Sequence, residues 1–195
     1  AYDIAVTDTA TAADAQTIMS AANGNNLNGA GEPGETTIAG VSGTYDEIKG
    51  LAIGSNDTIT TLTVTGTLSA AQAGEIAALK VGTNITNIVI AGIEDTPAAL
   101  IDLGTTILAY GTTVTASEAA TAEQAGNMVG DVDVYTIEDS FDNIMADTDD
   151  NAVIDEAAGI AGAAPNGVTV SDTLTIAQVG FLVGVDAYSV TDSDA

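Results

Sequence analysis

Apolar residues return at every second position in several short runs of this chain. The clearest runs are Leu62-x-Val64, Ile88-x-Ile90 and Val168-x-Val170. A period of two is the pattern of a β-strand that buries one face. Each of these runs is followed by a polar turn and then by a segment in which Ala, Ile, Leu and Val have helical spacing. The chain is therefore predicted to alternate between strands and short helices.

The first recurring pattern joins a strand-like run to a Ser/Thr-x-x-Gln segment. Three copies carry the glutamine, at Gln72, Gln124 and Gln178, with separations of 52 and 54 positions (124 − 72 and 178 − 124). A fourth copy has Asp14 in place of the glutamine. Self-similarity at a nearly constant step is the signature of a repeat architecture, in which each copy forms one structural unit.

A second pattern lies between these copies and reads as a short strand, a Gly or Asp turn and another helix start. Its copies align on Ile38, Ile90, Ile137 and Val190, with steps of 52, 47 and 53 positions. Because the two patterns alternate, the period is a double unit of about fifty residues. Each half of the double unit is predicted to be one strand followed by one helix.

The predicted helix starts carry a capping box. In this motif a hydroxyl accepts a hydrogen bond from the backbone N–H three residues on, and a Gln or Glu at that position reaches back. At a further start Pro97 follows Thr96, and proline suits the first helical position because its missing N–H would have no partner there. The predicted boxes are Ser69 with Gln72, Thr121 with Gln124, Thr175 with Gln178, and Thr44 with Glu47.

A strand, a helix and another strand imply parallel pairing through right-handed crossovers. Repetition at a near-constant step then predicts the fold class α/β, as a β/α repeat solenoid with a parallel sheet on one side and short helices on the other. We expect residues 1–195 to form a single repeat array. Two stretches interrupt it: a turn-rich loop over 23–34, and an inserted acidic segment over 147–167 with a helix over 152–163.

The charge of the chain limits its partners. The formal net charge is −26, yet 46% of the residues are hydrophobic, so a packed core is expected rather than a disordered acidic chain. The only basic residues are Lys49 and Lys80, each predicted to be a solvated surface charge. Binding to nucleic acid or to an anionic membrane surface needs many more basic residues than these two. Solvent cations or bound calcium must balance the acidic groups.

The sequence argues against catalysis and against membrane insertion. It contains no His, Cys or Trp. Without His the usual general base for a nucleophile is missing, and without Cys thiolate chemistry is excluded. Without Trp there is no indole ring of the kind that often stacks on a sugar. We therefore predict that the protein is not an enzyme. No segment has the 18 or so consecutive apolar residues of a membrane span. No signal peptide is visible at Ala1, so we expect either a mature product or a piece of a longer protein.

The candidate metal site is acidic and lies in the inserted segment. Asp147, Asp149, Asn151 and Asp155 occupy positions one, three, five and nine of an EF-hand-like calcium loop. Ala152 stands where the turn favours glycine, and position twelve lacks the bidentate Glu, since residue 158 is alanine. The alternative is a solvated acidic loop that caps the helix after it, and the residues leave both interpretations open.

Threonines recur along one side of a predicted strand, at Thr61, Thr63, Thr65 and Thr67. A regular hydroxyl array on a flat solenoid can order water, which is a route to ice binding. The preference of threonine for a solvated strand face explains the same pattern without any function.

Two kinds of segment alternate along the chain: Tyr-x-Ile-x-Asp segments at strand starts, as at Tyr135, and runs such as 168–178. This alternation resembles repeats in very large exported surface proteins of bacteria, cyanobacteria especially. The resemblance implies an extracellular location and calcium-assisted folding after export. We therefore predict a structural element of a surface layer, filament or adhesive stalk that associates with itself end to end or laterally. The alternative is an adhesin module that binds a glycan or another surface ligand.

Overall fold

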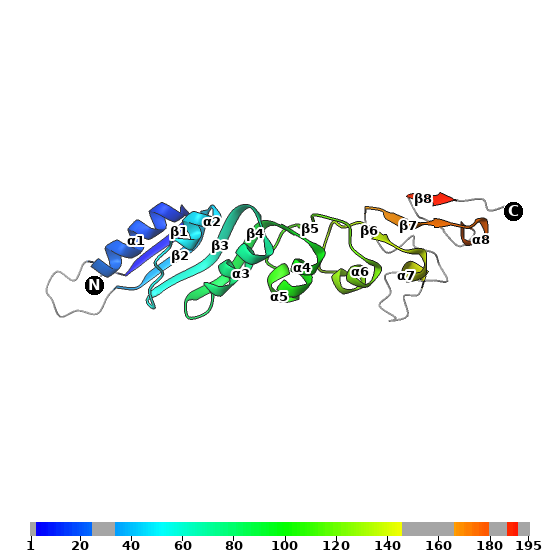
Figure 1. Cartoon of the computed structure of the whole chain (residues 1–195). Helices are drawn as coiled ribbons and strands as arrows, with labels where there is room; N and C mark the ends of the chain where they lie inside the picture. Colours follow the sequence, from blue (N-terminus) through cyan, green and yellow to red (C-terminus); the bar gives the residue numbers. More distant parts are fainter. Residues whose placement is uncertain (1–2, 25–33, 146–165, 180–186, 191–195) are drawn as a thin grey trace. The chain divides into compact units, whose positions relative to one another are not determined.

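Strands and helices alternate along the chain in the computed structural model, which describes residues 3–24, 34–145, 166–179 and 187–190 (Figure 1). The predicted alternation is therefore confirmed for the described residues, except that the helices Pro97–Leu103 and Thr105–Leu108 follow one another without a strand between them. The strands are β1 (Ile4–Thr11), β2 (Thr36–Gly43), β3 (Asp57–Leu68), β4 (Asn84–Asp95), β5 (Val114–Ala116), β6 (Ile137–Asp139), β7 (Val168–Leu174) and β8 (Ala187–Val190). The helices are α1 (Ala12–Gly24), α2 (Tyr45–Lys49), α3 (Ala70–Ala78), α4 (Pro97–Leu103), α5 (Thr105–Leu108), α6 (Ala122–Met128), α7 (Phe141–Met145) and α8 (Ile176–Val179).

Neighbouring strands in each sheet are consecutive in the sequence. One sheet has five strands in the order β1-β2-β3-β4-β5, and a second has three in the order β6-β7-β8. The pairs β1–β2, β2–β3, β3–β4, β6–β7 and β7–β8 are parallel. A mixed α/β protein with parallel strands, as the sequence predicted, is therefore confirmed.

The chain divides into two compact units. The first unit comprises Ala1–Ile93 and Ala109–Thr112, and the second comprises Glu94–Leu108 and Thr113–Ala195.

The core of the first unit is built from rows of aliphatic side chains that cross β2, β3 and β4. Ile38, Ile59 and Ile85 are register partners, and each is at most 4% exposed. Val41, Leu62 and Ile88 form the next row. Full burial of one such side chain contributes about 1.5–3 kcal/mol. The predicted period of two with one buried face is confirmed here.

The helices bury the same positions in successive repeats. In α3 the buried residues are Ala70, Ala73 and Ile76, the first, fourth and seventh of the helix. In α6 they are Ala122, Ala125 and Met128, again the first, fourth and seventh. Residues three apart lie on one face of a helix. The small alanines allow a close approach to the sheet, and the larger side chain fills the space beside the last turn.

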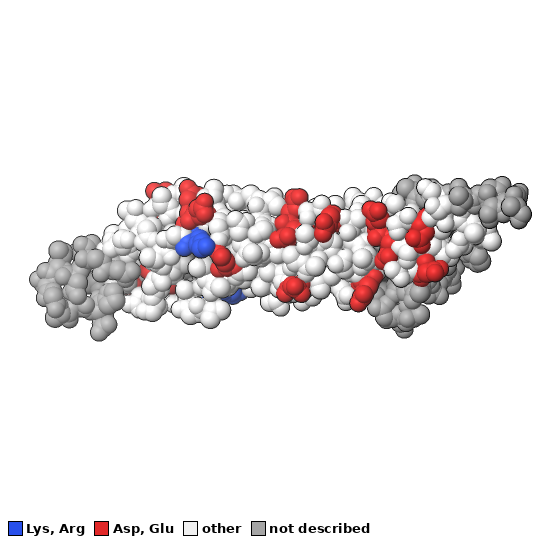
Figure 2. Space-filling view, in the orientation of Figure 1, with Lys and Arg blue, Asp and Glu red and all other residues white. Residues whose placement is uncertain are grey.

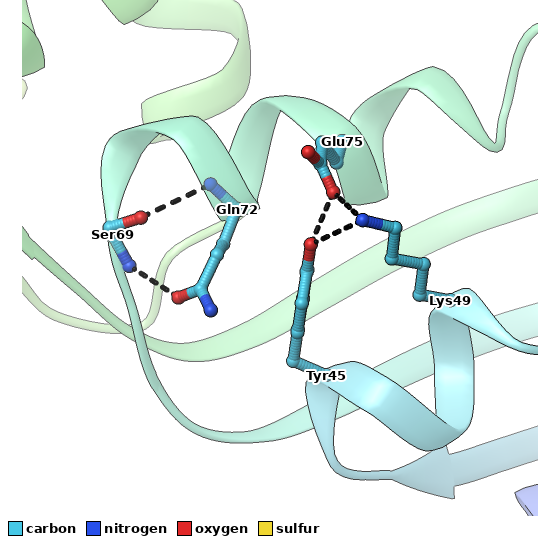
Figure 3. A network of polar contacts seen from close by, with 5 residues as sticks. All are labelled: Tyr45, Lys49, Ser69, Gln72 and Glu75. Carbon is cyan, nitrogen blue, oxygen red and sulfur yellow. Dashed lines mark hydrogen bonds and ion pairs between the residues drawn. The ribbon is translucent and has the colours of Figure 1, made fainter.

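The predicted caps at Ser69, Thr121 and Thr96 are confirmed. The Ser69 hydroxyl accepts from the Gln72 N–H at 3.2 Å, and Gln72 Oε1 accepts from the Ser69 N–H at 3.0 Å (Figure 3). Thr121 and Gln124 repeat this pair at 3.2 and 3.0 Å. The Thr96 hydroxyl accepts from the Ala99 N–H at 3.3 Å, directly before Pro97.

In the other predicted boxes the longer side chain reaches back to the cap residue. Glu47 Oε2 accepts from the Thr44 N–H at 2.8 Å, and Gln178 Oε1 accepts from the Thr175 N–H at 2.9 Å. Thr11, in the copy that carries Asp14, accepts from the Asp14 N–H at 3.2 Å. The recurring Ser/Thr-x-x-Gln, Glu or Asp segment therefore marks the starts of α1, α2, α3, α6 and α8.

A threonine packs against a glycine of the next strand at two equivalent places in the repeat. The register of β1 shifts between Val6 and Thr9, and a Cβ added to Gly40 would lie 2.7 Å from Thr9 Oγ1. In β3 the register shifts again before Thr67, and a Cβ on Gly92 would lie 3.1 Å from Thr67 Oγ1. A β-bulge increases the local twist of its strand. Glycine leaves room for the threonine that follows the bulge.

Strands β5 and β6 of the second unit are much shorter, with three residues each. Its buried side chains include Val114, Ile137, Val168 and Val170, each at most 4% exposed. The second unit thus keeps one inward face, but β5 and β6 provide few backbone hydrogen bonds between neighbouring strands.

Candidate functional site

The predicted calcium ligands lie outside the described residues. Asp147, Asp149, Asn151 and Asp155 all fall within 146–165, as does the helix predicted over 152–163. Gly167 ends the predicted insert, and its carbonyl accepts a hydrogen bond from the Ile137 N–H at 3.0 Å. The loop predicted over 23–34 begins within α1, which ends at Gly24, and residues 25–33 are outside the described residues.

Carboxylates of the second unit bind backbone N–H groups of the preceding strand–helix step. Asp139 Oδ2, at the end of β6, accepts from the N–H of Ala122 at 3.0 Å. Asp172 Oδ2, in β7, accepts from the N–H of Phe141 at 2.9 Å. Ala122 and Phe141 are the first residues of α6 and α7. Two strand aspartates therefore have equivalent roles in consecutive repeat steps.

The environment of Asp139 favours its ionised form. Its Oδ1 accepts from the Ser140 N–H at 2.8 Å and from Asn143 Nδ2 at 2.7 Å. Partial burial raises the pKa of Asp139, but the hydrogen bonds from Asn143, Ala122 and Ser140 outweigh burial and hold its pKa below the usual value. A negative charge beside a helix N-terminus also interacts favourably with the helix dipole.

A third bridge of this kind uses Asp133, whose Oδ2 accepts from the Val114 N–H at 2.7 Å. Among the residues that the structure describes, no three Asp or Glu side chains gather closely enough to hold a metal ion. The oxygens of the bridging aspartates face N–H donors, whose positive ends would repel a cation at the same place. Sequence reasoning missed these bridges, although Asp139 stands directly before Ser140 just as Asp95 stands before Thr96.

The main charge cluster of the first unit joins α2 to α3 (Figure 3). Lys49 forms an ion pair with Glu75, and the Tyr45 hydroxyl donates to the same carboxylate. Lys49 Nζ lies 2.9 Å from the Tyr45 hydroxyl oxygen and 5.2 Å from the centroid of its ring. The side chains of Lys49 and Glu75 are both 51% exposed. Lys49 is thus a surface charge, as predicted, and it also has an ion-pair partner that the sequence did not indicate.

Hydrogen bonding in this cluster shifts both charged groups toward their ionised forms. The hydrogen bonds to Glu75 and to Tyr45 raise the pKa of Lys49. The hydrogen bonds from Lys49 and from Tyr45 lower the pKa of Glu75. Lys80, the other basic residue, lies 5.6 Å from the ring centroid of Tyr110, which is within the range of a cation–π interaction.

The outward face of β2, of residues 58–68 in β3 and of residues 84–93 in β4 is exposed and carries no charge; the exposed Glu94 lies beyond it, near the end of β4. The chain holds no charged residue in Thr36–Gly43, in 58–68 or in 84–93. Exposed positions there include Thr37, Thr60 and Thr86. Figure 2 shows acidic side chains at several places on the face that is drawn, where basic side chains are few.

None of the helices that the structure describes combines the length and the apolar character needed to cross a membrane. Comparison with protein-family models, with curated proteins and with solved structures found no match to this chain.

Proposed function

We propose that this protein is an extracellular structural element of a bacterial cell surface, within a surface layer, filament or adhesive stalk. Its strand–helix steps stack as a β/α solenoid. The observation that carries this proposal is the repetition itself: parallel strands in chain order, with equivalent caps and buried helix positions. Ser69 and Thr121 start their helices in the same way, and the Thr9–Gly40 contact returns as Thr67–Gly92.

The proposed role is mechanical rather than catalytic. The chain contains no His, Cys or Arg, so the side chains that most often act as general base, thiolate nucleophile or anion clamp are missing. The basic residues Lys49 and Lys80 lie beside tyrosines at the surface. These features support a structural protein, with acidic surfaces that keep it hydrated and soluble.

Self-association, end to end or lateral, belongs to the proposal. Copies that each carry a formal charge of −26 repel one another. Lateral contact is best accommodated by the uncharged sheet face of β2, β3 and β4, since no carboxylate has to be desolvated there. Threonines such as Thr60 and Thr86 offer hydroxyl and methyl groups together. We further propose that calcium bridges acidic groups elsewhere and reduces the remaining repulsion.

Static light scattering of the purified chain during a calcium titration tests this proposal, with magnesium as the comparison ion. We expect the scattering mass to rise with calcium and to fall again with a chelator. Thr60→Glu should abolish the rise because it puts a charge on the uncharged sheet face. The control, Thr17→Glu, adds the same charge at an exposed position of α1 and should assemble like the parent. A monomeric mass at every calcium concentration would contradict the proposal.

A second candidate function is a ligand-binding adhesin module, and the same uncharged face favours it. Neutral glycans present hydroxyl groups that exposed threonine hydroxyls can match by hydrogen bonding. A glycan array separates the two functions. A purely structural element binds nothing on the array. An adhesin module binds a defined glycan, and the Thr60→Glu variant should no longer bind that glycan.

A further inference from the structure

We infer that the second unit is an acid-release device: the ionised Asp139 carboxylate holds two successive strand–helix steps together and lets them separate when it is protonated, while the first unit remains folded. This inference concerns the conformational response of the fold and does not rest on the proposed function.

The bridges form a series in the second unit. Asp133 holds the start of β5 through the Val114 N–H, Asp139 holds the start of α6 through the Ala122 N–H, and Asp172 holds the start of α7 through the Phe141 N–H. Each bridge joins a carboxylate to the strand or helix that precedes it in the repeat. The loss of one bridge therefore loosens the contact between two successive steps.

These bridges matter most where the strands are shortest. Strands β5 and β6 have three residues each, whereas β3 and β4 have twelve. A long ladder distributes cohesion over many backbone hydrogen bonds, which do not titrate. A three-residue strand provides few, so side-chain bridges supply a larger share of the cohesion between steps.

Protonation changes the chemistry of Asp139 in a specific way. Its two oxygens accept from three N–H groups, those of Ala122, Ser140 and the Asn143 side chain. A neutral carboxyl group turns one acceptor oxygen into a donor. That O–H would then face an N–H donor, and at least one of the three hydrogen bonds must break.

The other titratable groups on these elements are also acidic. Glu123 lies on α6, Glu138 on β6, Asp142 on α7 and Asp172 on β7, while both lysines belong to the first unit. These exposed carboxylates carry like charges, and like charges repel one another. Salt screens exposed charges much more than partly buried hydrogen-bonded ones. At moderate ionic strength the loss of the bridges therefore dominates.

The sign of the pH dependence follows from the direction of the Asp139 shift. A carboxylate whose pKa is lowered in the folded state stabilises that state above its unfolded pKa. This stabilisation is lost as the pH falls through the folded value. Because the pKa of Asp139 lies below its ordinary value, opening is expected on the acid side of the usual aspartate range.

Hydrogen exchange of the full chain across a pH series, corrected for intrinsic exchange rates, tests this inference at moderate salt. Peptides that cover 114–145 should lose at least tenfold in protection between neutral pH and the acid limit. Peptides that cover 36–68 should keep theirs. Equal loss in both regions, or full protection of 114–145 in acid, would overturn the inference.

A matched pair of variants identifies the carboxylate responsible. Asp139→Asn keeps one acceptor oxygen but replaces the other with a donor, so 114–145 should already be weakly protected at neutral pH. Glu138→Gln removes the neighbouring exposed charge and should leave the profile unchanged. If the profile of Asp139→Asn matches that of the parent, the inference fails.

A measurement on the parent protein covers the case in which Asp139→Asn does not fold. The side-chain carbonyl signal of Asp139, followed by NMR, should titrate on the acid side of the usual aspartate range. The amide signals of Ala122 and Ser140 should move together with Asp139. Titration of Asp139 without any response at Ala122 would overturn the bridge mechanism.

Discussion

The two units build the same strand–helix step by different means. In the first unit, long strands β3 and β4 pair along most of their length, and aliphatic rows such as Ile38, Ile59 and Ile85 fill the interior. In the second unit, the three-residue strands β5 and β6 are supplemented by carboxylate bridges such as Asp139 to Ala122. One repeat pattern therefore occurs both with long backbone ladders and with short strands that are supplemented by carboxylate bridges.

The largest expected effect comes from the aliphatic rows of the first unit. Leu62 is fully buried, so Leu62→Ala should destabilise the first unit by about 2–5 kcal/mol, from lost burial and the cavity left behind. Urea unfolding measures the change. The exposed neighbour Thr60→Ala is the control and should shift the midpoint little. If Leu62→Ala also costs only a few tenths of a kcal/mol, the row does not carry the stability of this unit.

The threonine–glycine contact should give the next largest effect. A Cβ at Gly40 would lie 2.7 Å from Thr9 Oγ1, so Gly40→Ala should cost about 1–3 kcal/mol through overpacking. Gly92→Ala should cost less, because the equivalent distance to Thr67 Oγ1 is 3.1 Å. Thermal unfolding ranks the two variants.

A double variant isolates the cause of the Gly40→Ala effect. Thr9→Ala removes Oγ1 and Cγ2, two of the three nearest atoms to the added Cβ, so Thr9→Ala with Gly40→Ala should recover most of the lost stability. A coupling of zero in this cycle would mean that backbone conformation, not the contact, selects glycine.

The helix caps should contribute equally to the stability of the two units, although the units differ in strand length. Ser69 and Thr121 each accept from the N–H three residues on, at 3.2 Å in both cases. Ser69→Ala and Thr121→Ala should each cost about 1 kcal/mol, measured by urea unfolding with a probe in each unit. Ser69→Thr is the control that keeps the hydroxyl. A marked inequality between the two alanine variants would show that the units differ at their helix starts as well.

Local signals in the sequence predicted the elements well. The hydroxyl at Ser69 with Gln72 three residues later, and the alternation at Leu62 and Val64, depend only on nearby residues. The contacts of Asp172 with Phe141 and of Lys49 with Glu75 join residues 31 and 26 positions apart. Such pairings depend on register between strands, which the spacing of one sequence does not determine.

The difference in strand length between the two units was also not predictable from local sequence signals. Recurrence at about fifty residues, seen at Gln72 and Gln124, predicts equivalent steps but not the lengths of their strands. Strand β3 extends over twelve residues and the equivalent β5 over only three. Across the aligned runs, Val64, Thr67 and Leu68 of the first copy are replaced by alanine at 116, 119 and 120 in the second. Smaller side chains at these positions still fit a strand, so they did not predict how short β5 would be.

The ion pair between Lys49 and Glu75 should have the smallest effect, although it is the most visible polar feature of the first unit. Both side chains are 51% exposed, and solvent and salt screen an exposed pair strongly. Lys49→Gln and Glu75→Gln should therefore change the urea midpoint little at physiological salt and somewhat more at low salt. The lowered pKa of Glu75 means that its contribution disappears as the pH falls. The raised pKa of Lys49 means that its contribution disappears only in strong base. A large, salt-independent loss of stability in either variant would mean that this polar pair stabilises the first unit as much as its strand ladder and aliphatic rows do, and the contrast between the units would fail.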